Sequence, residues 1–304
     1  MENDREKAER SARVGTLAAF GAYGLWGLFP LYWKRLAGID PVQILCHRIV
    51  WCAGLAVLLL ALTRRLGALA ALFKDLRRAL AACASAVLIT ANWGVYIWAV
   101  NTGHVAESSL GYYINPLLSV ALGALLLREK LDRWTIAAVA IAATGVCAAS
   151  VFMGRPPWIS LVLASSFALY GYVKKRAGLD PLTALAAETL VATPFALAFL
   201  ISRGAAGQGA FGGSDPVATA MLVLAGPVTA IPLLFFATAA NNISLTQMGF
   251  IQYLSPTLQL CLGVLVFGES VKAPMAVAFA SVIGAVGVYA FTRGRASREA
   301  KRGK

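Results

Sequence analysis

Charged residues are scarce in this chain. Of its 304 residues only 13% are charged and 59% are hydrophobic, and the mean hydropathy is +0.71. A soluble domain of this length needs far more charged surface to stay in solution. The scarcity of charge therefore excludes an ordinary soluble protein and favours an integral membrane protein.

The sequence motifs of common catalytic and metal sites are also absent, and histidine is scarce. There are two histidines, and the five cysteines occur singly, without any CxxC pair. The sequence contains no HExxH or GxSxG motif, and no Walker A sequence that would bind ATP. We therefore expect a protein that is not an enzyme and that uses no metal or other cofactor.

What the chain has instead is a series of long apolar blocks. A transmembrane helix needs roughly 20 predominantly apolar residues, and ten blocks approach or exceed that length. We therefore predict an all-α integral membrane protein with ten transmembrane helices. The predicted spans are 14–33, 43–62, 79–99, 105–127, 134–153, 157–173, 182–202, 216–240, 246–267 and 273–292.

The net charge of +13 follows membrane topology rather than nucleic-acid binding. With a cytoplasmic N-terminus, the cytoplasmic loops and tails carry 21 Lys and Arg residues, against 5 on the other side. This distribution obeys the positive-inside rule. We therefore expect a multi-pass protein of the cell inner membrane with no nucleic-acid partner. Both termini, residues 1–13 and 293–304, are expected to be cytoplasmic tails.

The sequence aligns with itself at a constant shift of 140 residues. Residues 32–41 fall on residues 172–181, and the same shift takes Pro116 to Pro256. Self-similarity at a fixed offset across most of a chain indicates an internal duplication.

Each copy of this duplication holds five predicted spans. Because five is odd, the second copy (154–292) must enter the membrane upside down relative to the first (14–153). Inverted repeats are the architecture of secondary transporters, which expose a central site alternately to the two sides of the membrane. We therefore predict two inverted five-helix repeats and transport by alternating access.

Three segments are similar to motifs of a known family. They are HRIVW at 47–51, ESSLGYYINPL at 107–117, and GFIQYLSPT at 249–257, followed by FGE at 267–269. They resemble the second-, fourth- and ninth-helix motifs of the RarD, or chloramphenicol-sensitive, proteins of the EamA group in the drug/metabolite transporter superfamily. The resemblance implies ten helices, a central substrate cavity, and export of small metabolites or drugs. Arg128 departs from the family pattern, which usually has glycine there.

Two ionisable residues, Arg48 and Glu188, stand inside predicted spans, one repeat length apart. A charge near the bilayer centre costs about 2.5–3.5 kcal/mol on insertion scales, so such a residue faces a cavity or a partner. At roughly 1.5 Å per residue, Arg48 is expected about 6 Å outward of the midplane and Glu188 about 6 Å inward. This separation favours different roles over a direct salt bridge, although structural capping of either residue is an alternative.

In that interpretation Arg48 attracts anionic groups in the outer half, and Glu188 carries a proton or attracts cations in the inner half. His47, beside Arg48, is a third candidate because imidazole titrates near physiological pH. A hydrogen-bonded structural histidine is the alternative.

Other polar and aromatic residues near mid-span are candidates for the wall of a cavity. Asn92, Trp93 and Tyr96 would present an amide and an aromatic surface suited to an amphipathic ligand, or serve as interfacial anchors. Pro116 and Pro256 each remove one helical hydrogen bond and are expected to form paired hinges or walls. The polar residues around the two prolines would line the cavity or join helices. They are Tyr113, Asn115, Gln252, Tyr253, Ser255 and Gln259.

The fifth and tenth predicted helices carry small residues at four-residue spacing, with almost no polar groups. Ala140 and Thr144 in the fifth match Ala280 and Gly284 in the tenth. This spacing is typical of close helix packing, either within the monomer or across a homodimer.

Together these features predict a secondary active transporter that exports a small metabolite or drug-like amphipathic solute. Its expected partners are the solute, a proton or another ion gradient, and the lipid bilayer. An uptake permease of the same fold, or a non-transporting assembly or sensor subunit, are the alternatives.

Overall fold

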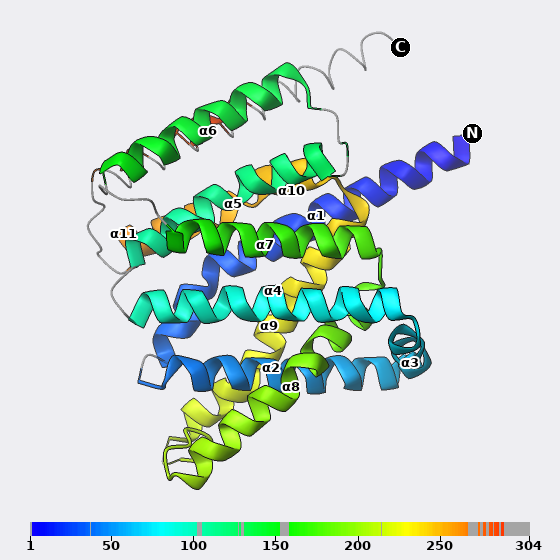
Figure 1. The fold of residues 1–304 in the computed structure, drawn as a ribbon, viewed down its shortest axis with the longest axis vertical. Helices are drawn as coiled ribbons and strands as arrows, with labels where there is room; N and C mark the ends of the chain where they lie inside the picture. Colours follow the sequence, from blue (N-terminus) through cyan, green and yellow to red (C-terminus); the bar gives the residue numbers. More distant parts are fainter. Residues whose placement is uncertain are drawn as a thin grey trace.

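A computed structural model of the chain describes residues 2–36, 38–101, 105–126, 128, 131–152, 158–213, 215–266 and scattered positions between 273 and 288. All regular elements within these ranges are helices (Figure 1). They are α1 Glu2–Trp33, the short 3₁₀ helix η1 Lys34–Leu36, α2 Pro41–Leu62, α3 Leu66–Lys74, α4 Leu76–Asn101, α5 Val105–Leu126, α6 Arg133–Phe152, α7 Trp158–Ala177, α8 Pro181–Ala205, α9 Pro216–Asn242, α10 Leu245–Ile251 and α11 Leu254–Leu265.

These helices confirm the predicted all-α membrane class. Among the described residues, α1, α2, α4, α6, α8 and α9 are long and apolar enough to cross a membrane. The first eight predicted spans each fall on one long helix, α1, α2 and α4 to α9. The tenth predicted span lies largely outside the described residues, as does the tail 293–304, so the count of ten helices stays a prediction.

The ninth predicted span is wrong as a single helix, because the structure divides it into α10 and α11 at Gln252 and Tyr253. Pro256 has no N–H to donate to the carbonyl four residues earlier, which belongs to Gln252. The backbone N–H of Ser255 bonds that carbonyl instead, at 3.2 Å. The tighter i to i+3 bond interrupts the α-helix at this point.

The predicted loop 63–78 contains a short helix, α3, that the hydropathy pattern did not reveal. Leu72 on α3 is buried against Ala82 of α4 and Ala187 of α8. The loop is therefore packed against the bundle rather than free in solvent.

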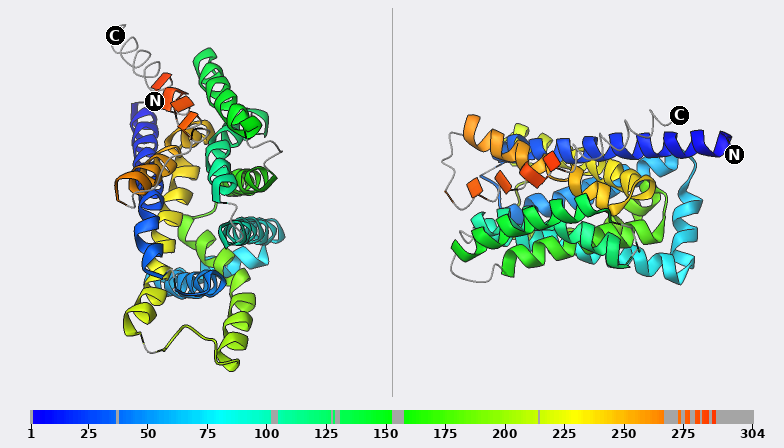
Figure 2. Two further views of the ribbon diagram at one scale, coloured as in Figure 1. Left: turned by 90° about the vertical axis from the view of Figure 1, so that its left-hand side faces the viewer. Right: turned by 90° about the horizontal axis from the view of Figure 1, so that it is seen from above.

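The long helices form a closed arrangement around a shared centre. In Figure 1, α2, α4, α7 and α5 run side by side, and each packs on the next. Seen from above in Figure 2, α1 lies on the side opposite α5 and α7. The path closes from α5 through α10 and α11 to α1, α9 and back to α2.

Helix contacts occur in equivalent pairs when the two sequence copies are exchanged. The 140-residue shift takes α1 to α7, α2 to α8, α4 to α9, and α5 to α10 with α11. Helix α1 packs on α9 as α7 packs on α4, and α2 packs on α9 as α8 packs on α4. Helix α5 packs on α7 as α10 and α11 pack on α1. One packing scheme is therefore used twice.

The same equivalence appears at the ends of α2 and α8, which pack antiparallel. Each helix begins with proline after an aspartate that caps its N-terminus, Asp40 for α2 and Asp180 for α8. Arg203, near the end of α8, pairs with Asp40 at 3.3 Å, and Arg65, just after α2, pairs with Asp180 at 3.1 Å. One Asp–Arg pair therefore joins the two helices at each end.

The Asp180 pair predicts a pH dependence of stability. Partial burial raises the pKa of Asp180, but hydrogen bonds from Thr183 and the charge of Arg65 outweigh burial and lower the pKa below its ordinary value. A carboxylate with a lowered pKa stabilises the fold at neutral pH, and that contribution is lost as the pH falls through the folded-state pKa.

We therefore expect the melting temperature of the detergent-purified protein to fall more steeply between about pH 5 and pH 3 than that of Asp180→Asn. Asparagine keeps the N-cap, so the difference reports the charge alone. Equal slopes for the two proteins would contradict this account of Asp180.

The fifth helix buries a different small-residue face from the predicted one. Ala138 and Ala142 of α6 are buried, and a Cβ added at Gly145 would meet Ser281 at 2.3 Å. Small residues therefore bring α6 close to the tenth predicted span within the monomer. The residues named from sequence face outward from the single chain, so their close packing across a homodimer stays a prediction; they are Ala140, Thr144, Ala280 and Gly284.

Candidate functional site

A cavity of about 210 Å³ lies among α1, α2, α4, α5, α7 and the α10–α11 break. It occupies the half of the bundle in which α1 ends and α2 begins. Its described polar lining residues are Arg48, Asn92, Asn115, Gln252, Ser255 and Gln259. Its aromatic lining residues are Tyr23, Trp26, Phe29, Trp33, Trp93, Tyr96, Tyr112 and Phe167, and Pro30 and Pro256 complete the wall.

Seven of the nine cavity residues predicted from sequence line this space. Tyr253 does not, since it precedes α11 as a buried residue whose hydroxyl has no partner in the described part of the chain. The side chain of Tyr113 lies outside the described residues. Its neighbour Tyr112 lines the cavity and packs edge-on against Tyr96, with ring centroids 5.6 Å apart.

Arg48 lies in the cavity between two indole rings. Its Cζ lies 4.6 Å from the ring centroid of Trp33 and 4.5 Å from that of Trp93. Indole faces attract a guanidinium through the negative face of the ring quadrupole. The Nε of Arg48 also donates to Thr229 Oγ1 at 3.0 Å. Helices α1, α4 and α9 therefore hold the guanidinium of α2 in place.

The cavity amides take part in interhelical bonding as well as forming the wall. The amide nitrogen of Asn92, on α4, donates to the carbonyl of Leu163 at 2.8 Å and to Ser166 Oγ at 2.9 Å, both on α7. That of Gln259, on α11, donates to the carbonyl of Trp26 on α1 at 3.1 Å. The two interpretations of these residues, cavity wall and interhelical glue, are thus compatible.

An aromatic layer separates the cavity from the opposite half of the bundle. Phe236 of α9 is at its centre, 2% exposed, with ring centroids 5.7 Å from Trp26, 5.4 Å from Phe167 and 5.5 Å from Tyr170. Trp26 and Phe167 line the cavity, whereas Tyr170 reaches Glu188 on the other side, with its hydroxyl 3.2 Å from Oε1. The rings therefore close the cavity at this end.

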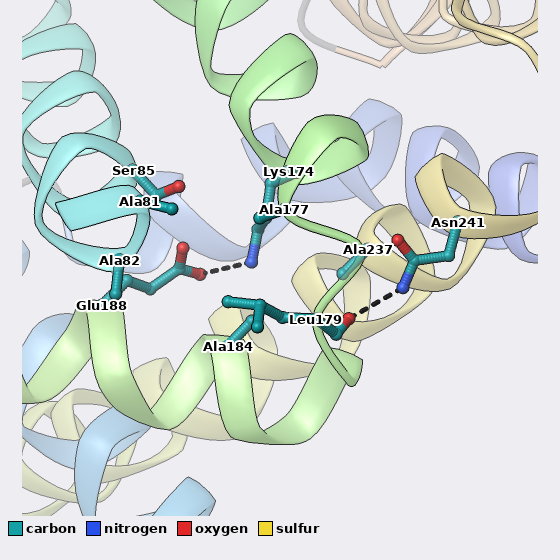
Figure 3. Close-up of a pocket in the computed structure, with 10 residues that line it drawn as sticks. All are labelled: Ala81, Ala82, Ser85, Lys174, Ala177, Leu179, Ala184, Glu188, Ala237 and Asn241. Carbon is teal, nitrogen blue, oxygen red and sulfur yellow. Dashed lines mark hydrogen bonds and ion pairs between the residues drawn. The ribbon is translucent and has the colours of Figure 1, made fainter. Parts of the chain in front are cut away.

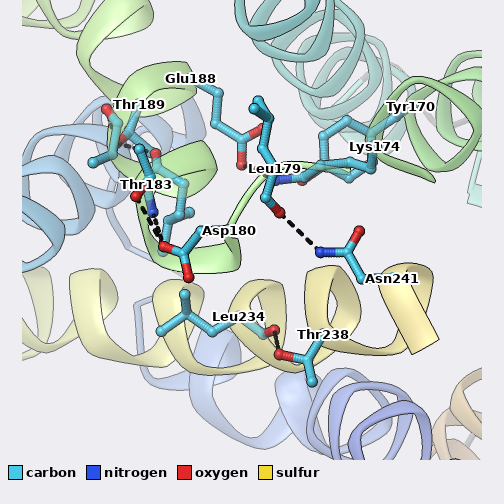
Figure 4. A network of polar contacts seen from close by, with 12 residues as sticks. Tyr170, Lys174, Leu179, Asp180, Thr183, Glu188, Thr189, Leu234, Thr238 and Asn241 are labelled. Atoms are coloured by element: carbon cyan, nitrogen blue, oxygen red, sulfur yellow. Dashed lines mark hydrogen bonds and ion pairs between the residues drawn. The ribbon is translucent and has the colours of Figure 1, made fainter. Parts of the chain in front are cut away.

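Beyond the layer, Glu188 of α8 forms a buried ion pair with Lys174 of α7. The Nζ of Lys174 lies 2.9 Å from Glu188 Oε1, and the side chains are 5% and 3% exposed. Both residues line a pocket of about 10 Å³, space for about one water. Figure 3 shows their side chains pointing toward each other, with a dashed line for the ion pair. Figure 4 shows Tyr170 next to the pair. Glu188 Oε2 has no partner in the described part of the structure.

The counting of Lys174 as a cytoplasmic loop charge is wrong. Helix α7 runs on to Ala177, four residues beyond the predicted span, and turns Lys174 into the bundle. Hydropathy ended the span just before three successive basic residues, although the first of them, Lys174, is buried.

Arg48 and Glu188 do not form a salt bridge. The carboxylate of Glu188 pairs with Lys174, and Arg48 lines the larger cavity on the other side of the aromatic layer. The two charges thus lie in separate pockets, and their depths relative to the membrane midplane stay a prediction.

The remaining candidates lie outside the cavity or act through the backbone. His47 is buried and stacks on Phe211 with ring centroids 5.4 Å apart, so it does not line the cavity. Pro116 lies within a continuous α5, whereas Pro256 stands in the first turn of α11. A Cβ on Gly249 would approach the carbonyl oxygen of Pro116 to 2.8 Å, so α10 packs closely on α5 at Pro116.

Sequence reasoning missed several residues that shape the two pockets, among them Trp33, Thr229, Tyr170 and Lys174. Trp33 stands at the end of α1, where interfacial aromatic residues are common, and Thr229 and Tyr170 stand in apolar spans. Lys174 was hidden among neighbouring basic residues. The one usable signal was Tyr170–Lys174 at i, i+4, which places both side chains on one helix face.

Comparisons with known proteins agree with this architecture. The model of the EamA-like transporter family matches the chain twice, over residues 13–151 and 156–292. Protein RarD of Streptomyces exfoliatus is 42% identical over 97% of this chain and 94% of its own length. Uncharacterized transporter YojE of Bacillus subtilis (strain 168) is 40% identical over 90% of this chain and 92% of its own. A solved crystal structure has the same fold, with a TM-score of 0.70 at 19% identity over 91% of this chain and 97% of the other.

Proposed function

Since the chain belongs to the EamA-like transporter family, we propose that it is a secondary active transporter that exports a small metabolite or drug-like amphipathic solute across the inner membrane. The observation that carries this proposal is the cavity of about 210 Å³, with its aromatic and amide wall and its aromatic layer at one end. Apolar walls with a few convergent polar groups are typical of small-molecule sites.

Alternating access would follow from the two inverted repeats, 14–153 and 154–292. The twofold use of one helix-packing scheme supports this duplication. The excess of Lys and Arg in the predicted inner loops and tails supports cytoplasmic termini, and that orientation would put the cavity in the periplasmic half. An exchange of shape between the repeats would close that half and open the other.

Proton coupling is assigned to Glu188. A proton on its carboxylate would remove the charge that holds Lys174 and so weaken the contact between α7 and α8 in the inner half. Tyr170 and Lys174 face the carboxylate from α7, and Ser85 of α4 and Asn241 of α9 line the same small pocket. The pocket offers space for about one water beside the pair.

The test is solute flux in liposomes that contain the purified protein. The panel comprises amino acids, aromatic metabolites and amphenicol drugs, each with and without a pH gradient. For Glu188→Gln we expect gradient-driven flux to be lost while exchange of solute without a gradient persists, because glutamine can accept the Tyr170 bond but cannot carry the proton.

The matched control is Asp215→Asn, which changes the capping residue of α9 outside both pockets and should leave coupling intact. Persistent gradient dependence in Glu188→Gln would overturn the assignment of Glu188. Failure to move any solute of the panel in either direction would count against the transport proposal as a whole.

A further inference from the structure

The charge of the cavity comes from one residue. Among the described lining residues, Arg48 is the one basic side chain, and none carries a carboxylate. A cleft with charge of one sign and low-dielectric walls concentrates ligands of the opposite sign. An anionic group on the solute is therefore favoured in this space.

The guanidinium is positioned but not neutralised. Trp33 and Trp93 flank it, and its Nε is occupied by Thr229. The guanidinium forms no ion pair with a described carboxylate. The carboxylates of Glu188, Asp40 and Asp180 pair with other cations. The N–H groups on its two terminal nitrogens match the two oxygens of a carboxylate.

The rest of the cavity limits what can carry that carboxylate. Eight aromatic side chains of the described residues line it, which suits a flat or apolar body. Its volume of about 210 Å³ is below the ~300 Å³ at which sites for drug-sized ligands begin. A single arginine also offers one charge, whereas a phosphate or a dicarboxylate would leave a second negative charge without a partner.

We propose, building on the transport function above, that the cavity binds a small monocarboxylate with an aromatic or apolar body, and that Arg48 holds its carboxylate. The competing role for Arg48 is structural: a cation that joins α1, α4 and α9 through its two indoles and Thr229. The two roles differ in one respect, because only the first makes ligand affinity depend on the charge of the ligand.

The experiment is a calorimetric titration of the full-length protein in detergent with three ligands that share a phenyl body. They are phenylacetate, the neutral phenylethanol and the cationic phenethylamine. We expect phenylacetate to bind at least about tenfold more tightly than the other two, as hydrogen bonds to a charged group allow. Arg48→Gln should lower the affinity for phenylacetate at least about tenfold. Arg48→Lys should lower it by less, since lysine keeps the charge but lacks the paired N–H groups of the guanidinium.

Arg203→Gln is the matched control, because it removes an arginine that pairs with Asp40 outside the cavity; its affinity for phenylacetate should equal that of the native protein. Equal affinity for the three ligands, no binding of phenylacetate, or unchanged affinity in a folded Arg48→Gln would each overturn the proposal. Should Arg48→Gln fail to fold, the comparison of ligands on the native protein still decides.

The outcome is separable from that of the transport proposal. Selective binding of phenylacetate without flux of any solute would uphold this inference and overturn transport. Flux of a neutral solute without selective binding of phenylacetate would uphold transport and overturn this inference.

Discussion

Replacing Lys174 with methionine is expected to lower the free energy of unfolding by about 3–5 kcal/mol, the usual cost of removing one partner of a buried ion pair. Methionine preserves most of the length and apolar character of the side chain but leaves Glu188 as an uncompensated charge in the bundle. The loss should be larger at pH 8 than at pH 5, since a proton can neutralise the abandoned carboxylate. Thermal and denaturant unfolding in detergent would measure both effects.

A second variant separates the pair from the packing around it. Lys174→Met combined with Glu188→Gln removes both charges and should recover most of the lost stability, because replacing a buried pair as a whole costs little. Arg176→Met provides the matched control, a basic residue two positions later that is exposed and should change stability by less than about 0.5 kcal/mol. A Lys174→Met protein as stable as this control would show that the pair contributes nothing.

The membrane class and most of the helix boundaries could be predicted from the sequence because they depend on the length of apolar blocks. The described helices from α1 to α9, apart from α3, begin and end within a few residues of the predicted spans, except at the N-terminus of α1. Mean hydropathy does not show which side of a helix faces a partner. The predicted sixth span therefore ended before Lys174, whose side chain is buried, and the short helix α3 in the loop 63–78 was not predicted.

The candidate site could be predicted only in part, for a related reason. Arg48, Asn92 and Gln252 stood out because polar groups are rare inside apolar spans, and all three line the cavity. Trp33 and Phe236 could not stand out, since aromatic residues are common in membrane helices whether they face lipid, a cavity or a core. Their roles depend on contacts between helices far apart in sequence, which a single chain does not reveal.

The two repeats share one helix-packing scheme but differ in the residues at equivalent positions. The residues around Arg48 are Trp33, Trp93 and Thr229. The 140-residue shift replaces these with apolar side chains in the other half, which are Val173, Leu233 and Ile89. Arg48 itself becomes Glu188. The half with the guanidinium holds a cavity, and the half with the carboxylate holds a space for about one water. Under the proposed alternating access, the duplicated fold would provide the motion. Substitutions at equivalent positions make the two halves of the bundle unequal.

The aromatic layer should control whether solute passes from the cavity to the half of the bundle that contains Glu188. We expect Phe236→Ala to lower the free energy of unfolding by about 2–3 kcal/mol. This is less than the ~3–5 kcal/mol of a soluble core, because lipid is as apolar as the bundle interior and only the packing is lost. The variant should also release a preloaded solute from liposomes without any gradient, since the missing ring opens the barrier between the cavity and Tyr170.

Phe195→Ala is the control for both readouts, because Phe195 on α8 is 78% exposed and takes no part in the layer. It should unfold close to the native protein and should not leak. If Phe236→Ala retains solute as tightly as Phe195→Ala does, the seal must lie elsewhere, and the buried Lys174–Glu188 pair becomes the next barrier to test, since it stands directly beyond the rings.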